Sequence, residues 1–145
     1  MNDELIKQFK TAHQSILVTI DQINPMTRSY RQAKPFIRDL QTKLLAHFER
    51  QNDSLFKPLE EFHAEHRPSA KMIEFLRYDL KDIKIKLLVF FDRHSGEIND
   101  IYNRSFPKDF TEFSQAVIGR IKVEEDFLLP LLKLAKELKK KNGGK

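Results

Sequence analysis

Apolar residues recur along most of this chain at alternating steps of three and four, the spacing that places them on one face of a helix. This spacing predicts four helices, over about residues 3–23, from near Pro35 to about residue 62, from Pro68 past Phe90, and from near Pro107 to about residue 132. Steps that average about 3.5 residues are typical of helices packed nearly parallel to one another. No segment alternates with the period of two that predicts a strand. The sequence therefore predicts an all-α protein, an antiparallel up-down four-helix bundle.

Local signals mark the limits of these helices. Asn24 and Pro25 end the first one. Pro58 lies inside the second, and we expect it to kink or locally break the helix, because proline lacks an N–H and clashes with the preceding turn. Ser69 follows Pro68 and is the expected N-cap of the third helix.

Composition sets the domain count and excludes several function classes. At 145 residues the chain is long enough for one core, so we expect residues 1–140 to form a single domain and residues 141–145 a flexible basic tail. Part of the net charge of +5 lies in the final stretch KELKKKNGGK, without the basic face and interleaved aromatics of a nucleic-acid site. The N-terminus has no apolar region typical of a signal peptide, and no apolar run is long enough to span a bilayer. We therefore expect a cytoplasmic protein with no nucleic-acid or membrane partner, and the absence of cysteine excludes thiolate metal sites.

Five polar residues interrupt the apolar stripes near the middle of their helices: His13, His47, Gln51, Arg120 and Glu124. Buried polar groups need partners, and an antiparallel bundle brings the middles of its helices to one level. We therefore expect these side chains to form one cluster. The stretches HFERQNDSLFKPL and RIKVEEDFLLPLL, from His47 and from Arg120, share one layout at an offset of 73, so the second and fourth helices look like two copies of one unit.

This stripe of histidines and carboxylates, with a polar pair one turn apart followed by apolar residues and a proline, resembles the hemerythrin-like, or HHE cation-binding, domains. The resemblance covers about Ile6 to Leu132 and implies a four-helix bundle with a non-haem di-iron centre. It implies that His13, His47 and Glu124 stand at the ligand positions of the first, second and fourth helices.

The chain departs from that family pattern at three ligand positions, which hold Gln51, Leu80 and Arg120. Glutamine offers no charge and cannot bridge two metals as a carboxylate does, and leucine offers no donor. Arginine adds a permanent positive charge beside the expected cations. These departures argue against two bound irons.

Two hypotheses follow for the cluster, and the departures favour the first, in which no metal is bound. In the first, the metal site is degraded into a polar core network in which Arg120 pairs with Glu124 one turn away, and the bundle acts as a regulatory or protein-interaction module. In the second, His13, His47 and Glu124 hold one iron or another divalent metal, with Gln51 as a weak ligand, in oxygen or nitric oxide sensing or in iron handling. No nucleophile motif or phosphate-binding loop is present, so we do not expect an enzyme.

The remaining polar residues have simpler interpretations. Helical geometry places Asp79, Asp82 and Glu125 off the stripes, as surface charges rather than ligands. His63 and His66 are expected at an exposed helix end, with a surface zinc site as the alternative. His94 lies near the end of the third helix, where a partly charged imidazole suits the helix dipole.

Extra apolar residues on the third and fourth helices leave a further choice open. Leu88, Phe91, Leu129 and Leu132 either cover the sides of the bundle or form an exposed patch for a homodimer or a partner protein.

Overall fold

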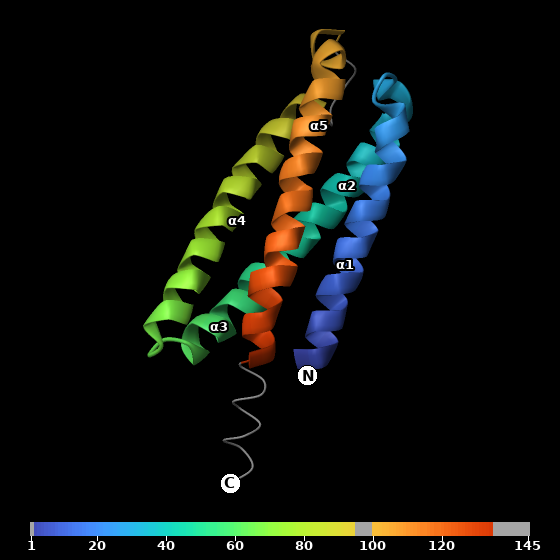
Figure 1. The fold of residues 1–145 in the computed structure, drawn as a ribbon. Helices are drawn as coiled ribbons and strands as arrows, with labels where there is room; N and C mark the ends of the chain where they lie inside the picture. Colours follow the sequence, from blue (N-terminus) through green and yellow to red (C-terminus); the bar gives the residue numbers. More distant parts are fainter. Residues whose placement is uncertain (1, 95–99, 135–145) are drawn as a thin grey trace.

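The computed structural model describes residues 2–94 and 100–134, and these form an all-α four-helix bundle (Figure 1). Its four long helices run alternately up and down, and no strand occurs among the described residues, which confirms the predicted fold. The expected tail at residues 141–145 lies outside the described residues. The elements are α1 Asn2–Ile23, a 3₁₀ turn Asn24–Met26, α2 Tyr30–Gln51, a π-helical turn Asn52–Phe56, α3 Lys57–Phe62, α4 Arg67–His94, α5 Asp100–Val123 and a second π-helical turn Glu124–Leu128.

Three helices begin earlier than the sequence predicts. The second begins at Tyr30 and the fourth at Asp100, so Pro35 and Pro107 lie inside helices instead of opening them. Pro35 is exposed, and so is the residue four positions before it, so water can replace the backbone bond that proline cannot make.

The start of α4 also corrects the expected N-cap. The helix begins at Arg67, so Ser69 lies in its first turn. The cap is His66, whose Nδ1 accepts a hydrogen bond from the backbone N–H of Ser69 at 3.3 Å.

A π-helical turn precedes a proline in both halves of the chain. Pro58 is the second residue after Asn52–Phe56, and Pro130 is the second residue after Glu124–Leu128. In a regular helix each proline ring would clash with the carbonyl group four residues earlier, and the wider turn relieves that clash. The expected local break at Pro58 therefore takes the form of a wide turn. The internal repeat seen in the sequence extends to the backbone at an offset of 72, one less than the 73 that relates the polar pairs.

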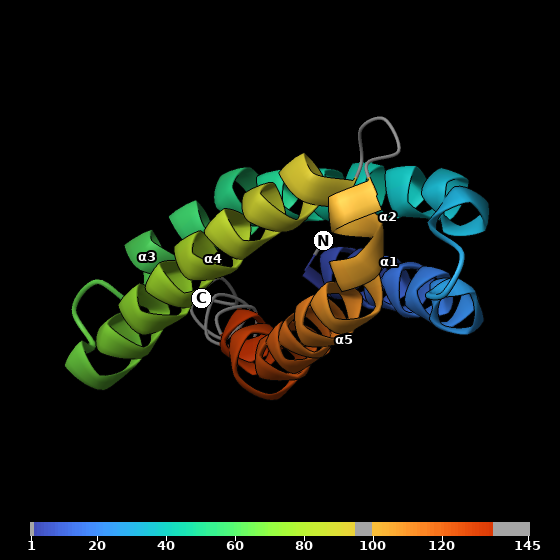
Figure 2. The same cartoon turned by 90° about the horizontal axis from the view of Figure 1, so that it is seen from above.

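The core lies along the predicted stripes. Helix α1 packs along α2 and α4 along α5, as the view from above shows (Figure 2). Near the end of the bundle where α4 finishes, the rings of Phe90 and Phe113 stack with centroids 4.2 Å apart.

Among the described residues, no helix has both the length and the apolar character needed to cross a bilayer.

Most of the extra apolar residues on the last two helices cover the sides of the bundle. Phe91, Leu129 and Leu132 are buried, whereas 63% of Leu88 is exposed. Covering the bundle therefore explains three of these four residues, and Leu88 belongs to an exposed surface of α4.

Candidate metal site

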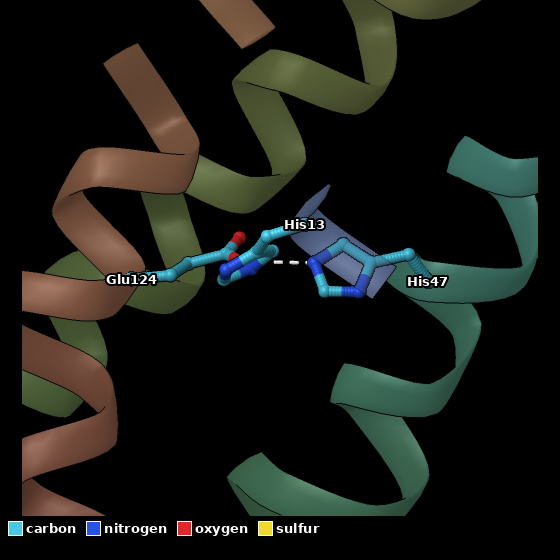
Figure 3. Close-up of side chains that lie close together, drawn as sticks. All are labelled: His13, His47 and Glu124. Atoms are coloured by element: carbon cyan, nitrogen blue, oxygen red, sulfur yellow. Dashed lines mark hydrogen bonds and ion pairs between the residues drawn. The ribbon is translucent and has the colours of Figure 1, made fainter. Parts of the chain in front are cut away.

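Three helices bring His13, His47 and Glu124 together in the middle of the bundle (Figure 3). Nε2 of His13 lies 2.7 Å and Nε2 of His47 lies 2.8 Å from the same atom, Oε1 of Glu124. All three side chains are at least 96% buried. Because an ionised carboxylate only accepts hydrogen bonds, both imidazoles donate an Nε2–H to it.

The two imidazoles are held in place by ring contacts as well as by the carboxylate. The ring of His47 meets that of His13 edge to face, with centroids 4.8 Å apart, and meets Phe9 in the same way at 5.3 Å. Phe9 is one turn before His13 on the buried stripe of α1, so the apolar spacing that packs this helix also orients the polar pair.

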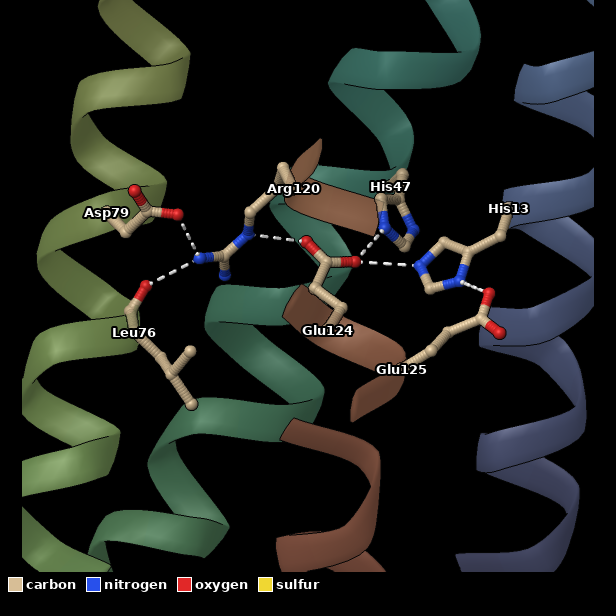
Figure 4. Close-up of polar contacts among 7 residues, drawn as sticks. All are labelled: His13, His47, Leu76, Asp79, Arg120, Glu124 and Glu125. Carbon is tan, nitrogen blue, oxygen red and sulfur yellow. Dashed lines mark hydrogen bonds and ion pairs between the residues drawn. The ribbon is translucent and has the colours of Figure 1, made fainter. Parts of the chain in front are cut away.

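Arg120 extends the cluster to the opposite side of the bundle (Figure 4). Its Nε donates to Oε2 of Glu124 at 2.7 Å, as the one-turn spacing predicts. Its Nη1 donates to Oδ2 of Asp79 and to the backbone carbonyl of Leu76, both at 2.9 Å. Only 2% of the arginine is exposed, so three fixed acceptors compensate a buried guanidinium.

Glu125 joins the cluster from the side of α1. Its Oε2 lies 2.8 Å from Nδ1 of His13, whose Nε2 already faces Glu124. Both ring nitrogens of His13 therefore face carboxylate oxygens and both carry protons, which makes this imidazole a cation in the arrangement seen here. Burial alone would lower the pKa of His13, but the hydrogen bonds and charges of Glu124 and Glu125 raise it above its ordinary value.

Glu124 is ionised at the centre of this network. Burial alone would raise its pKa, but hydrogen bonds from His13 and His47 and the positive charge of Arg120 hold the pKa of this carboxyl well below its usual range.

Asp79 and Glu125, expected as surface charges rather than ligands, do lie outside the group of candidate ligands, but each is bonded to the buried cluster. Both are about one-third exposed, yet each closes one end of the network. Asp82 does lie on the surface, where it pairs with Lys86 at 3.3 Å. The sequence does contain a signal for these missed partners. Glu124 alone cannot accept all the hydrogen bonds that a buried arginine and two buried imidazoles donate, so the cluster requires further acceptors.

Four of the five residues of the predicted cluster therefore lie together. The structure brings together His13, His47, Arg120 and Glu124. Gln51 is the last residue of α2, but its side chain lies outside the described part of the structure. Leu80, at the remaining family position, is buried and contributes no polar atom.

The donor set itself suits a metal ion. His13, His47 and Glu124 each offer one ligand atom, and these three atoms lie within 4.8 Å of one another. Glu125 holds Nδ1 of His13 in the way that second carboxylates orient metal-binding histidines, leaving Nε2 directed at the site.

The other histidines lie away from this site. His94 is the last residue of α4, as predicted; it is buried, and its Nε2 lies 2.9 Å from Oδ2 of Asp109. His63 is also buried, which corrects the exposed position predicted for it, whereas His66 is exposed. The hydroxyl of Ser69 links these two imidazoles, with Oγ–Nδ1 distances of 2.9 Å to His63 and 2.6 Å to His66.

Comparison with known proteins identifies the family of the chain. No curated protein and no solved structure matches the chain. The family model of the hemerythrin HHE cation binding domain matches residues 4–132, which include all four helices and every residue of the cluster. The chain thus belongs to the hemerythrin HHE cation-binding domain family.

Proposed function

We propose that this protein binds one divalent cation between His13, His47 and Glu124. The observation that supports this is the convergence of two imidazole nitrogens and one carboxylate oxygen, from three helices, within 4.8 Å in the core. Two histidines and one carboxylate form a donor set that binds iron(II) and leaves positions open for an exogenous ligand.

The distances fit a cation after the ligands rearrange. Ligand atoms bound tetrahedrally at about 2.0–2.1 Å lie roughly 3.3 Å from one another. The Nε2 atoms of His13 and His47 lie 2.7 and 2.8 Å from Oε1 of Glu124, and all three ligand atoms lie within 4.8 Å of one another. The carboxylate therefore has to withdraw by roughly half an ångström and the two imidazole nitrogens have to approach each other, which side-chain rotations would have to provide.

The charges of the network favour one cation over two. A cation at this site would take the place of the Nε2 protons, so His13 and His47 would both be neutral. The guanidinium of Arg120 and the carboxylates of Asp79, Glu124 and Glu125 would then leave two negative charges. One divalent cation offsets them in full, whereas two would leave an excess of positive charge in the core.

Arg120 also fills the place where a second cation would need a ligand. Its Nε lies 2.7 Å from Oε2 of Glu124, so the second oxygen of this carboxylate is engaged by a fixed positive charge. A di-iron centre does not fit these residues. Iron handling, or sensing of oxygen or nitric oxide at one iron, is the role that we propose for the site.

Metal content tests the proposal directly. The protein is expressed in iron-supplemented cells and purified anaerobically without chelator, and iron, zinc and manganese are counted per chain by mass spectrometry. We expect about one metal per chain, lost in His47→Ala and kept in the matched control His66→Ala, because His66 lies outside the cluster. Less than about a tenth of a metal per chain would overturn the proposal. Two irons per chain would refute the charge argument.

A second candidate is a metal-free network in a regulatory or interaction module. The observation that favours it is that hydrogen bonds from Arg120, His13 and His47 engage both oxygens of Glu124. This candidate predicts the same melting temperature with a chelator as with added iron. A metal-binding protein instead gains RT ln(1 + [L]/Kd) of stability.

A further inference from the structure

The outer side of α4 carries an unusual amount of exposed apolar surface. Half of the large exposed hydrophobic side chains among the described residues lie on this one helix, at the edge of the bundle in Figure 1. They are Met72, Phe75, Tyr78, Ile85, Leu88 and Val89, each between 40% and 67% exposed.

Part of this surface has the spacing of a helix-packing seam. Phe75, Tyr78, Asp82, Ile85 and Val89 follow one another at alternating steps of three and four. The buried stripe of α4 already faces the bundle, so this second seam is directed away from it. A helix with two such seams has packing positions for a helix on either side.

A hollow beside the seam would receive side chains from a partner helix. It lies between α4 and α5 and has a volume of about 420 Å³. Ile85 and Val89 line its α4 side, and the stacked rings of Phe90 and Phe113 also border it. Lys86, Arg93, Asp109 and Glu112 also line the hollow, so it offers a partner side chain both apolar and charged surface.

We propose that the outer face of α4 binds α4 of a second copy of this chain, with the two helices antiparallel. The seam continues at its ends, by the same spacing, to Lys71 and Asp92. Antiparallel pairing about a two-fold axis near Lys81 brings Lys71 of each copy close to Asp92 of the other. Parallel pairing instead places Lys71 and Asp92 each beside its own equivalent, which are like charges, whereas Asp82 lies near its own equivalent in either orientation.

The exposed apolar side chains supply part of such an interface. An interface of standard size buries about 800 Å² on each partner, and one aromatic side chain supplies about 150–250 Å² when fully covered. Phe75 and Tyr78 are 65% and 67% exposed, and Ile85 and Val89 on the same seam are 61% and 48% exposed. The charged side chains of Asp82 and Lys86, which are 61% and 56% exposed, have to supply the rest of the face.

The oligomeric state of the full chain tests this interface. Light scattering after gel filtration at about 100 µM, where a standard interface is populated, should give twice the 17.2 kDa mass of the chain. Val89→Glu should restore the monomer mass. The matched control Val18→Glu, at a valine of α1 that is 53% exposed against 48% for Val89, should leave the dimer intact. A monomeric parent, or a dimer that survives Val89→Glu, would overturn the proposal.

Cross-linking tests the antiparallel orientation, and the absence of cysteine makes it specific. Lys81→Cys lies near the proposed axis and should form a disulfide with its own equivalent. Two copies of Lys71→Cys would lie roughly 30 Å apart, at a rise of about 1.5 Å per residue, and should cross-link only when mixed with Asp92→Cys. Efficient cross-linking of Lys71→Cys to itself would show a parallel dimer and refute the arrangement.

Discussion

Among the described arginines that form salt bridges, Arg120 should be the one whose replacement by leucine destabilises the fold most. The guanidinium is 2% exposed and is paired with Glu124 at 2.7 Å and Asp79 at 2.9 Å. Leucine fills part of the volume but leaves the carboxylate of Glu124 buried without its cation. Removing one partner of a buried ion pair costs about 3–5 kcal/mol.

The expected loss lies near the lower end of that range. Glu124 keeps two imidazole donors, His13 and His47, so its carboxylate is not left without partners. We therefore expect the free energy of unfolding to fall by about 3 kcal/mol, and the melting temperature by about 10 °C for a domain of this size. Urea unfolding followed by far-UV circular dichroism at pH 7, with EDTA to remove metal, measures this loss.

Two further variants show whether burial of the charge is the cause. Arg77→Leu removes an arginine that is 43% exposed and paired with Glu60, and it should cost no more than about 1 kcal/mol. Adding Glu124→Gln to Arg120→Leu should recover part of the loss, because the stranded charge is gone. If Arg120→Leu and Arg77→Leu cost the same, the guanidinium of Arg120 is hydrated and the buried-pair argument fails.

Three other changes test the polar groups separately. Burial would raise the pKa of Asp109, but the hydrogen bond and charge of His94 lower it below the value of about 3.8 in the unfolded chain. The ionised carboxylate therefore stabilises the folded state in full above pH 3.8, and this stabilisation disappears as the pH falls through the pKa of the folded state. Asp109→Asn should therefore be less stable than the parent at pH 7 and equal to it near pH 2 in urea titrations; a constant difference would contradict this. Glu125→Gln should weaken metal binding about tenfold in competition with a chromogenic chelator, because His13 loses its orienting carboxylate. Arg120→His should raise the metal content per chain, and no gain would mean that its charge does not limit binding.

The spacing of apolar residues predicts most of this fold and the central part of the site. Positions such as Leu44 and Ile73 lie on stripes that the structure buries, and the same stripes contain His13, His47 and Glu124. The helical period directs these side chains into the core together with the apolar residues of their stripes. Their positions can therefore be predicted from a single sequence.

The ends of the network could not be predicted in this way. Asp79 is next to a buried leucine and is aimed away from the stripe, but Arg120 is long enough to reach its carboxylate from α5. Glu125 follows Glu124, where the backbone widens into a π-helical turn and the regular spacing no longer gives side-chain directions. Side-chain reach and local backbone shape decided both contacts, and neither is encoded in the hydrophobic pattern.

The two π-helical turns make the bundle sensitive to the number of its residues. Each wide turn holds one residue more than a regular turn, and successive residues of an α-helix differ by about 100° in direction. Deleting one residue within Glu124–Leu128 would leave a regular turn, so Leu129 and Leu132 would keep their direction towards the core. The ring of Pro130 would then meet the carbonyl group four residues earlier, so the cost of the deletion comes from the proline. The extra residue and the proline are therefore coupled, and related chains that keep the proline should keep the wide turn.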